Sequence, residues 1–135
     1  MSKSAANHGG LTAADYVHLH NHTQFSLLDG LTKIPELVAF AKEQGMPAVA
    51  MTDHGTLSGA VEFYKECKAQ GVKPIIGIET YVAARKHTDK DPVKDKQRYH
   101  LILLATNEAG WHNLMKLSTE ANLHGMYYFP RVDHE

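Results

Sequence analysis

Residues 47–71 decide the fold of this chain, and they read PAVAMTDHGTLSGAVEFYKECKAQG. The short apolar run from Pro47 to Met51 predicts a buried strand. After the turn residues that follow, apolar side chains return at helical spacing, at Ala60, Phe63, Tyr64 and Cys67. Gly71 is a residue type that is common just past the end of a helix. A strand that leads into a helix in this way is the building block of α/β proteins with parallel sheets.

The same order of elements repeats on both sides of this stretch. Thr32 is a good helix N-cap and Gly45 a good stop, so we expect a helix between them. Short apolar runs predict strands at 16–20, 73–78 and 99–105, with an extended piece at 81–84 and a helix after Asn107. This alternation predicts an α/β fold in which the strands are parallel.

Length and composition indicate one globular domain. The chain has 135 residues, of which 43% are hydrophobic, and its formal net charge of -1 gives no overall basic field for nucleic acid. Its single cysteine, Cys67, reads as a buried apolar residue. No apolar run approaches the roughly 20 residues that cross a bilayer, and no signal peptide opens the chain, so we expect a cytoplasmic protein with no membrane partner. We expect residues 1–15 to form a flexible tail and residues 16–135 to be the N-terminal part of a domain in a truncated chain.

One segment carries a local surplus of positive charge. Residues 85–98 hold six basic and three acidic residues with almost nothing apolar, which predicts an exposed loop. Contact with phosphates and simple solvation both fit this composition, and solvation is the commoner explanation.

The ten histidines are the outlying feature of the composition, because imidazole is a frequent ligand of transition metals. In parallel α/β folds the carboxyl ends of the strands converge on the ligand site. The expected strands end here in His18, His20 and His22, in Asp53 and His54, and in Glu79. Residues two apart on a strand face the same way, so His20 and His22 can hold one ion together. Three strands thus deliver metal-type ligands to one rim.

Each candidate also has a purely structural explanation. A single His-x-His pair is as often exposed or hydrogen-bonded as metal-bound, Asp29 also fits an Asp-Gly turn, and His100 also fits an ordinary strand position. Surface positions are favoured for the other five histidines: His8, His87, His112, His124 and His134. The joint occurrence of imidazoles and carboxylates favours a metal site, and such mixed ligands suit Zn, Mn or Fe.

The reaction class follows from the metal site. Divalent ions lower the pKa of bound water and neutralise charge on a phosphoryl group, so phosphoester hydrolysis is the leading class. The sequence contains no G-x-x-x-x-G-K-[ST] phosphate loop and no G-x-S-x-G nucleophile motif that would suggest another.

Three motifs resemble those of a known family, the PHP (polymerase and histidinol phosphatase) superfamily. They are His20-Asn21-His22-Thr23, Thr52-Asp53-His54-Gly55 and Gly77-Ile78-Glu79. More specifically, residues 17–30, 99–105 and 128–131 are similar to the N-terminal PHP domains of bacterial replicative DNA polymerases. The resemblance implies a distorted (β/α)7 TIM-like barrel, of which this chain would be the first part. It also implies up to three metal ions at the C-terminal rim of the barrel.

The resemblance implies roles for single residues as well. His20 and His22 would bind one ion, Glu79 would bridge two ions, Asp29 and His54 would bind another, and His100 would be a further ligand. His20, His22 and Glu79 would take part in catalysis. Asp53 and His18 would support ligands without touching an ion.

The implied function is that of the PHP segment of a replicative polymerase, whose metal site removes nucleotides from a DNA 3′ end. The implied partners are that DNA end and other holoenzyme subunits, a sliding clamp and a proofreading exonuclease; the Mg-dependent polymerase site would lie outside this chain. Two alternatives stay open, a stand-alone phosphatase for a small ester such as histidinol phosphate, and a non-catalytic platform that stabilises the polymerase or docks the exonuclease. The isolated segment would hold an incomplete site, so we expect it to be inactive alone.

Overall fold

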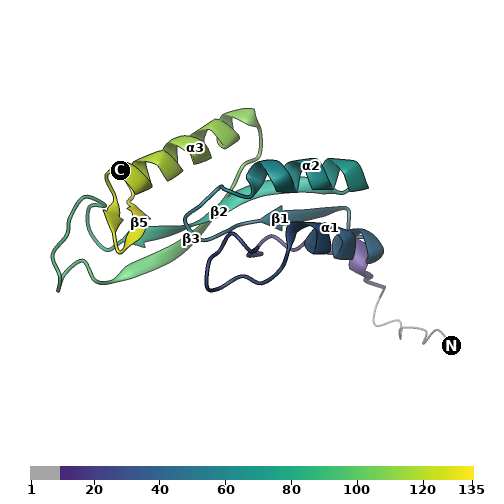
Figure 1. The fold of residues 1–135 in the computed structure, drawn as a ribbon, viewed down its shortest axis with the longest axis horizontal. Helices are drawn as coiled ribbons and strands as arrows, with labels where there is room; N and C mark the ends of the chain where they lie inside the picture. The colour runs from purple at the N-terminus through teal and green to yellow at the C-terminus, as the bar shows by residue number, and fades with distance from the viewer. Residues whose placement is uncertain (1–9) are drawn as a thin grey trace.

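A computed structural model describes residues 10–135 of the chain. Its elements are η1 (Ala13–Asp15), α1 (Ile34–Glu43), β1 (Ala48–Met51), α2 (Ala60–Gln70), β2 (Lys73–Ala83), β3 (Arg98–Leu104), α3 (Glu108–Leu123), β4 (Met126–Tyr127) and β5 (Phe129–Val132). The expected tail at 1–15 overlaps residues 1–9, which lie outside the described residues, and η1 follows them. The fold is mixed α/β, as the sequence predicts (Figure 1).

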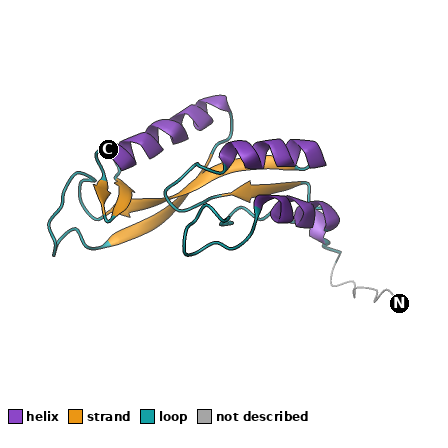
Figure 2. Cartoon of the chain, in the orientation of Figure 1, coloured by secondary structure: helices purple, strands orange, loops and turns teal. Residues whose placement is uncertain are grey.

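Strand β2 is the centre of the sheet. Its first half pairs in parallel with β1, with Ala50 opposite Ile75 and Met51 opposite Ile76. Its second half pairs antiparallel with β3 along residues 77–83 and in parallel with β5 at Tyr81 and Val82. Because β3 occupies one edge of β2, the pairing with β5 uses the other edge, where β1 also lies (Figure 2).

The main core lies between β1 and the helices α1 and α2. All four residues of β1 are buried, and Ile34, Val38, Phe63 and Cys67 pack on them, each 0% exposed. Burial of these apolar side chains holds both helices against the sheet. Tyr64, which the helical spacing places on the buried face of α2, is instead 48% exposed.

Three expectations about the strands are wrong. Residues 16–20 form no strand, because one main-chain hydrogen bond joins the segment to β1, from the Ala50 N–H to the His18 carbonyl; the next, from Thr52 to Asn21, lies just beyond both. The expected fourth strand, β3, runs antiparallel to β2, because it returns through the loop at 84–97 with no crossover helix. The pieces expected at 73–78 and 81–84 are one continuous strand, so Glu79 lies within β2 and not at its end.

The described part of the chain is drawn out along the sheet, with α1 toward one end of the long axis and β5 toward the other (Figure 1). A small antiparallel pair, β4 with β5, packs beside α3 at one end and was not expected from the sequence. Among the described residues, no helix has both the length and the apolar character needed to cross a membrane.

Candidate metal centre

The segment that carries His20 and His22 is fixed beside β1 by Asn21. The Asn21 side-chain amide donates to the carbonyl oxygens of His18 and Ala50 at 3.1 and 3.0 Å. The main-chain N–H of Asn21 also donates to the Thr52 hydroxyl at 3.0 Å. These bonds replace a regular strand ladder and leave the two histidines on either side of Asn21 facing the same region.

Glu79 is the centre of the cluster. It is 4% exposed, and its Oε2 lies 2.5 Å from His20 Nε2 and 2.7 Å from His22 Nε2. Its Oε1 contacts His100 Nδ1, which comes from the neighbouring strand β3. Burial raises the pKa of the Glu79 carboxyl, but hydrogen bonds from His100, His22 and His20 outweigh burial and hold that pKa at about 2. Glu79 is therefore an anion that presents both oxygens to imidazole nitrogens.

Asp29 and His54 extend the cluster toward solvent. The Asp29 Oδ2 atom lies 3.1 Å from His22 Nδ1 and 2.9 Å from His54 Nε2. Hydrogen bonds from His22 and His54 hold the pKa of Asp29 below its ordinary value. The other ring nitrogen of His54, Nδ1, lies 3.7 Å from Glu79 Oε1. His54 thus stands between the two carboxylates.

The donor atoms fit divalent ions. Three sets each bring ligand atoms within 4.8 Å of one another: His20, His22 and Glu79; His22, Asp29 and His54; and His54, Glu79 and His100. The Nε2 atoms of His20 and His22 are 3.1 Å apart, within the separation of about 2.9–3.4 Å that bonds of about 2.0–2.1 Å to one ion produce. His54 Nδ1 is buried with no hydrogen-bond partner among the described residues, which suits a nitrogen whose lone pair faces an ion.

Asp53 holds in place the loop at 20–30, which carries His20, His22 and Asp29. It is 0% exposed and accepts from the Thr23 N–H at 2.6 Å, the Thr23 hydroxyl at 2.7 Å and the Ser26 hydroxyl at 2.7 Å. The Ser26 oxygen in turn accepts from the His54 N–H at 3.1 Å. Main-chain bonds also join Asp53 and Gly55 to Glu79. Asp53 therefore connects the neighbours of His22 and His54 without reaching the cluster itself.

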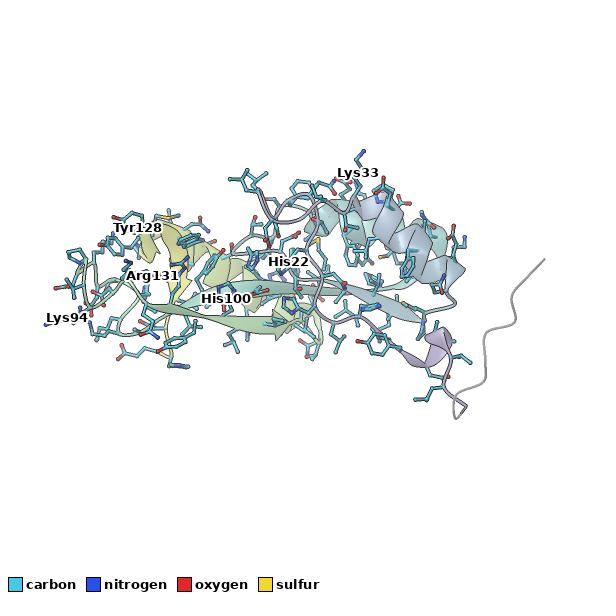
Figure 3. The ribbon with its side chains drawn as sticks, turned by 90° about the horizontal axis from the view of Figure 1, so that it is seen from below. His22, Lys33, Lys94, His100, Tyr128 and Arg131 are labelled. Carbon is cyan, nitrogen blue, oxygen red and sulfur yellow. The ribbon has the colours of Figure 1, made fainter. Side chains whose placement is uncertain are left out.

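The structure brings together six sequence candidates, His20, His22, Asp29, His54, Glu79 and His100. It does not bring the His18 ring to them; that ring packs edge-on against Tyr16 at 4.7 Å. Figure 3 shows His22 and His100 near each other over the sheet, although they are far apart in the sequence.

Tyr81, which was not expected as a site residue, borders the cluster. Its ring stacks on His54 at 5.8 Å and meets His100 edge-on at 5.0 Å. Burial raises the pKa of its hydroxyl. The signal was its position two residues after Glu79, since alternate residues of one strand share a face.

The sequence expectation for His87 is wrong. His87 is not a surface residue, because its ring bonds Asp133 at 2.8 Å and Glu120 at 3.0 Å and its side chain is 19% exposed.

Close relatives of the chain are bacterial replication proteins. It is 54% identical over 127 residues to DNA polymerase III subunit alpha of Aquifex aeolicus, covering 90% of this chain and 11% of the relative. It is 51% identical over 120 residues to that of Campylobacter jejuni and 52% identical over 124 residues to that of Thermus aquaticus, covering 89% of this chain and 10% of each relative. The chain thus spans about a tenth of the length of these relatives.

Solved structures share the fold. A protein of Bifidobacterium adolescentis described as a metal-dependent phosphoesterase aligns with a TM-score of 0.52 at 23% identity, over 78% of this chain and 34% of that one. An amidohydrolase of Chromobacterium violaceum aligns with a TM-score of 0.53 at 20% identity, over 77% and 34%. The PHP domain model matches residues 18–135. With the cluster, the fold and this match in agreement, the chain belongs to the PHP domain family.

Proposed function

We propose that this chain is the N-terminal PHP segment of a DNA polymerase III alpha subunit and that its metal centre hydrolyses phosphodiester bonds at a DNA 3′ end. The observation that carries the proposal is the arrangement around Glu79, where histidines from three separate segments, the last of them His54 at 3.7 Å, surround one buried carboxylate. Imidazole and carboxylate donors at this spacing suit Zn, Mn or Fe. About 50% identity to polymerase alpha subunits over most of the chain supports the placement.

The residues divide into ligands and supports. His20, His22, Asp29, His54, Glu79 and His100 would hold the ions, with Glu79 able to present one oxygen to each of two sites. Asp53 would hold the loop at 20–30 in place, and His18 would act only through its main-chain carbonyl. All three pairs among His20, His22 and Glu79 are within 3.1 Å, so we assign the reaction to their set.

The bound ions would lower the pKa of an attacking water and neutralise charge on the scissile phosphate. The chain's own residues set the conditions for this. The ionised Glu79 balances part of the positive charge from within the sheet, while the exposed side of His20, with 52% of its side chain accessible, leaves room for substrate. Tyr81 packs against the rings of both His54 and His100 and limits how these ligands can move.

The proposal extends to the setting of the whole protein. We infer that the partners are the DNA 3′ end, a sliding clamp and a separate proofreading exonuclease, that a Mg-dependent polymerase site lies elsewhere in the full-length chain, and that the protein works in the cytoplasm. The chain covers only part of its relatives, so we expect residues outside it to complete the centre.

Metal content and nuclease activity of the full-length protein test the proposal. We expect two or three transition ions per chain by elemental analysis and a 3′ cleavage that chelator abolishes. The double variant His20→Ala/His22→Ala should lose at least one ion and the cleavage. His112→Ala is the matched control, because this histidine is 56% exposed and lies outside the cluster.

Three outcomes would contradict the proposal. Cleavage that persists in the double variant would place the reaction elsewhere. Stoichiometric metal without cleavage would favour a structural platform over a catalytic site. A reaction confined to small phosphate esters would favour a phosphatase.

A further inference from the structure

A pocket lined by cationic and aromatic side chains lies near the far end of the β2–β3 hairpin. Its volume is about 410 Å³, and none of the metal-site residues lines it. Its walls include Lys96, Arg98, Tyr127, Tyr128, Phe129 and Arg131. Figure 3 shows Tyr128 and Arg131 together at this end of the molecule, with Lys94 beyond them and His22 and His100 nearer its middle.

Arg98 is held in place by aromatic rings and not by an anion. Its guanidinium carbon lies 3.7 Å from the centroid of the Phe129 ring and 5.6 Å from that of Tyr81. No ion pair engages it within residues 10–135, and its buried Nε has no hydrogen-bond partner there. A planar donor with unused N–H groups is suited to the oxygens of a phosphate.

Arg131 adds a buried charge that also lacks an anionic partner. It is 1% exposed, and its Nη2 donates only to the carbonyl oxygens of His87 and Asp89, at 2.8 and 2.6 Å. Its buried Nη1 has no partner among the described residues. Its Nε also donates to the Gly125 carbonyl oxygen at 3.2 Å. A buried cation that forms no ion pair attracts an anion from outside.

The one carboxylate on the pocket wall does not cancel these charges. Asp95 is 2% exposed, and Arg85 Nε and Nη2 bind its two oxygens at 2.8 and 2.6 Å. Asp95 is thus paired with an arginine outside the pocket lining, and Arg131 acts on it only through the weaker effect of its charge. Lys96, Arg98 and Arg131 leave the pocket with a positive balance.

Tyr128 supplies an exposed ring at the mouth of the pocket. It is 84% exposed and adopts a positive φ of 59°, which is strained for a residue with a side chain. The ring of Tyr127 meets it edge-on at 4.8 Å. Aromatic faces beside cationic side chains are the usual means of holding single-stranded nucleic acid.

The pocket is connected to the metal centre along one face of the hairpin. Tyr81 lies opposite His100 and Ala83 opposite Arg98, so Arg98 follows His100 on the same face, about 7 Å along the strand. Tyr81 contacts both the metal centre and the pocket, because the centroid of its ring lies 5.0 Å from that of His100 and 4.8 Å from that of Phe129. This separation is comparable to that of neighbouring phosphates in an extended strand.

We propose that the pocket binds a backbone phosphate of single-stranded DNA, next to the phosphate at the metal centre. Arg98 and Lys96 contact the phosphate, and the buried Arg131 adds positive charge from the wall of the pocket. Tyr128 stacks on the adjoining base. The identity of the ligand as a DNA strand rests on the function proposed above. The site would select a strand of several nucleotides over a small phosphate ester.

Photochemical cross-linking on the full-length protein tests this site without requiring turnover. The probe is a short single-stranded oligothymidylate with one 5-iodouracil, irradiated in the presence of chelator so that it is not cleaved. We expect peptide mapping to find it attached at residues 127–129. Arg98→Met, which retains a side chain over Phe129, should lower the yield about tenfold, as loss of a charged hydrogen bond predicts.

Two further variants separate charge from local packing. Lys96→Gln removes an exposed cation of the pocket and should also lower the yield, whereas Lys94→Gln, on the same loop but outside the pocket lining, should not. Arg98→Lys should restore part of the yield. Equal cross-linking in the parent and in Arg98→Met, or no attachment at 127–129 in the parent, would overturn the proposal.

Competition distinguishes a strand from another anion. An unlabelled oligothymidylate should displace the probe, and displacement by a glutamate-rich peptide in its place would show a protein-docking site and overturn the proposal. The readout needs neither metal nor cleavage. Failure of the phosphodiesterase proposal, seen as cleavage that persists in His20→Ala/His22→Ala, is therefore distinguishable from failure of this one.

Discussion

Removal of the Asp53 carboxylate should release the loop that carries His22 and Asp29. In Asp53→Ala, the Thr23 N–H loses the only acceptor that residues 10–135 offer it, and two hydroxyls lose a charged partner. An orphaned buried N–H costs about 1–3 kcal/mol and each lost hydroxyl bond about 1 kcal/mol, so the loop should open more easily by about 4 kcal/mol. In Asp53→Asn, the amide oxygen can retain the bonds at Oδ1 and the amide N–H can donate to the Thr23 hydroxyl. We expect this variant to lose only about 1.4 kcal/mol.

Hydrogen exchange of the full-length protein, read by mass spectrometry on peptides covering 20–30, measures this opening. At about 1.4 kcal/mol per tenfold, exchange should accelerate about a thousandfold in Asp53→Ala and about tenfold in Asp53→Asn. Peptides from α3 should not change in either variant, since α3 packs on β2, β4 and β5. Equal exchange in Asp53→Ala and the parent would refute the reasoning, and so would equal exchange in the two variants, because the argument depends on the hydrogen bonds and not on the charge alone.

Two other predictions concern groups outside the metal centre. Hydrogen bonds to Asp133 and Glu120 raise the pKa of His87 above its ordinary value, so its contribution to holding the loop at 84–97 is complete below about pH 6.5 and is lost as pH rises through the raised value. Amide hydrogen exchange of that loop, corrected for intrinsic rates, should increase over this pH range in the parent and should show no such step in His87→Gln. His124, which also bonds Glu120, is present in both proteins. Burial raises the pKa of the Cys67 thiol to about 11, and the side chain is 0% exposed, so iodoacetamide at pH 8 should modify Cys67 only after unfolding. Rapid labelling of the native protein would show that α2 opens far more readily than its packing suggests.

The helices and the buried strands could be predicted because their signals are local. The spacing around Phe63 and Cys67, the stop at Gly71 and the apolar run at 47–51 all reappear in α2 and β1. The direction of β3 could not be predicted, since an apolar run at 99–105 fits either a parallel or an antiparallel neighbour. The segment at 16–20 failed as a strand because Asn21 satisfies main-chain carbonyls with its side chain, which period-2 patterns do not detect.

The cluster was predictable as a set, and its internal pairing was not. Positions near the ends of expected strands were enough to predict that His20, His22, His54 and Glu79 lie close together. Whether Glu79 lies inside β2, and whether Tyr81 borders His54, depends on where β2 ends. The apolar run breaks at Glu79 and Thr80 although the strand continues to Ala83, so the sequence does not mark that end. His87 was assigned to the surface because its partners Asp133 and Glu120 are far away in the sequence.

The antiparallel return of β3 has a consequence for the order of folding. Glu79 meets His54 across the parallel edge of β2 and His100 across the antiparallel edge, while His20 and His22 come from a segment fixed beside β1. Each pairing closes a loop of different length, and long-range closures are slow because chain entropy is lost before contacts compensate. The donor set is complete only after the hairpin, the crossover and the N-terminal segment have all docked, which makes its assembly a late event and a sensitive reporter of native topology.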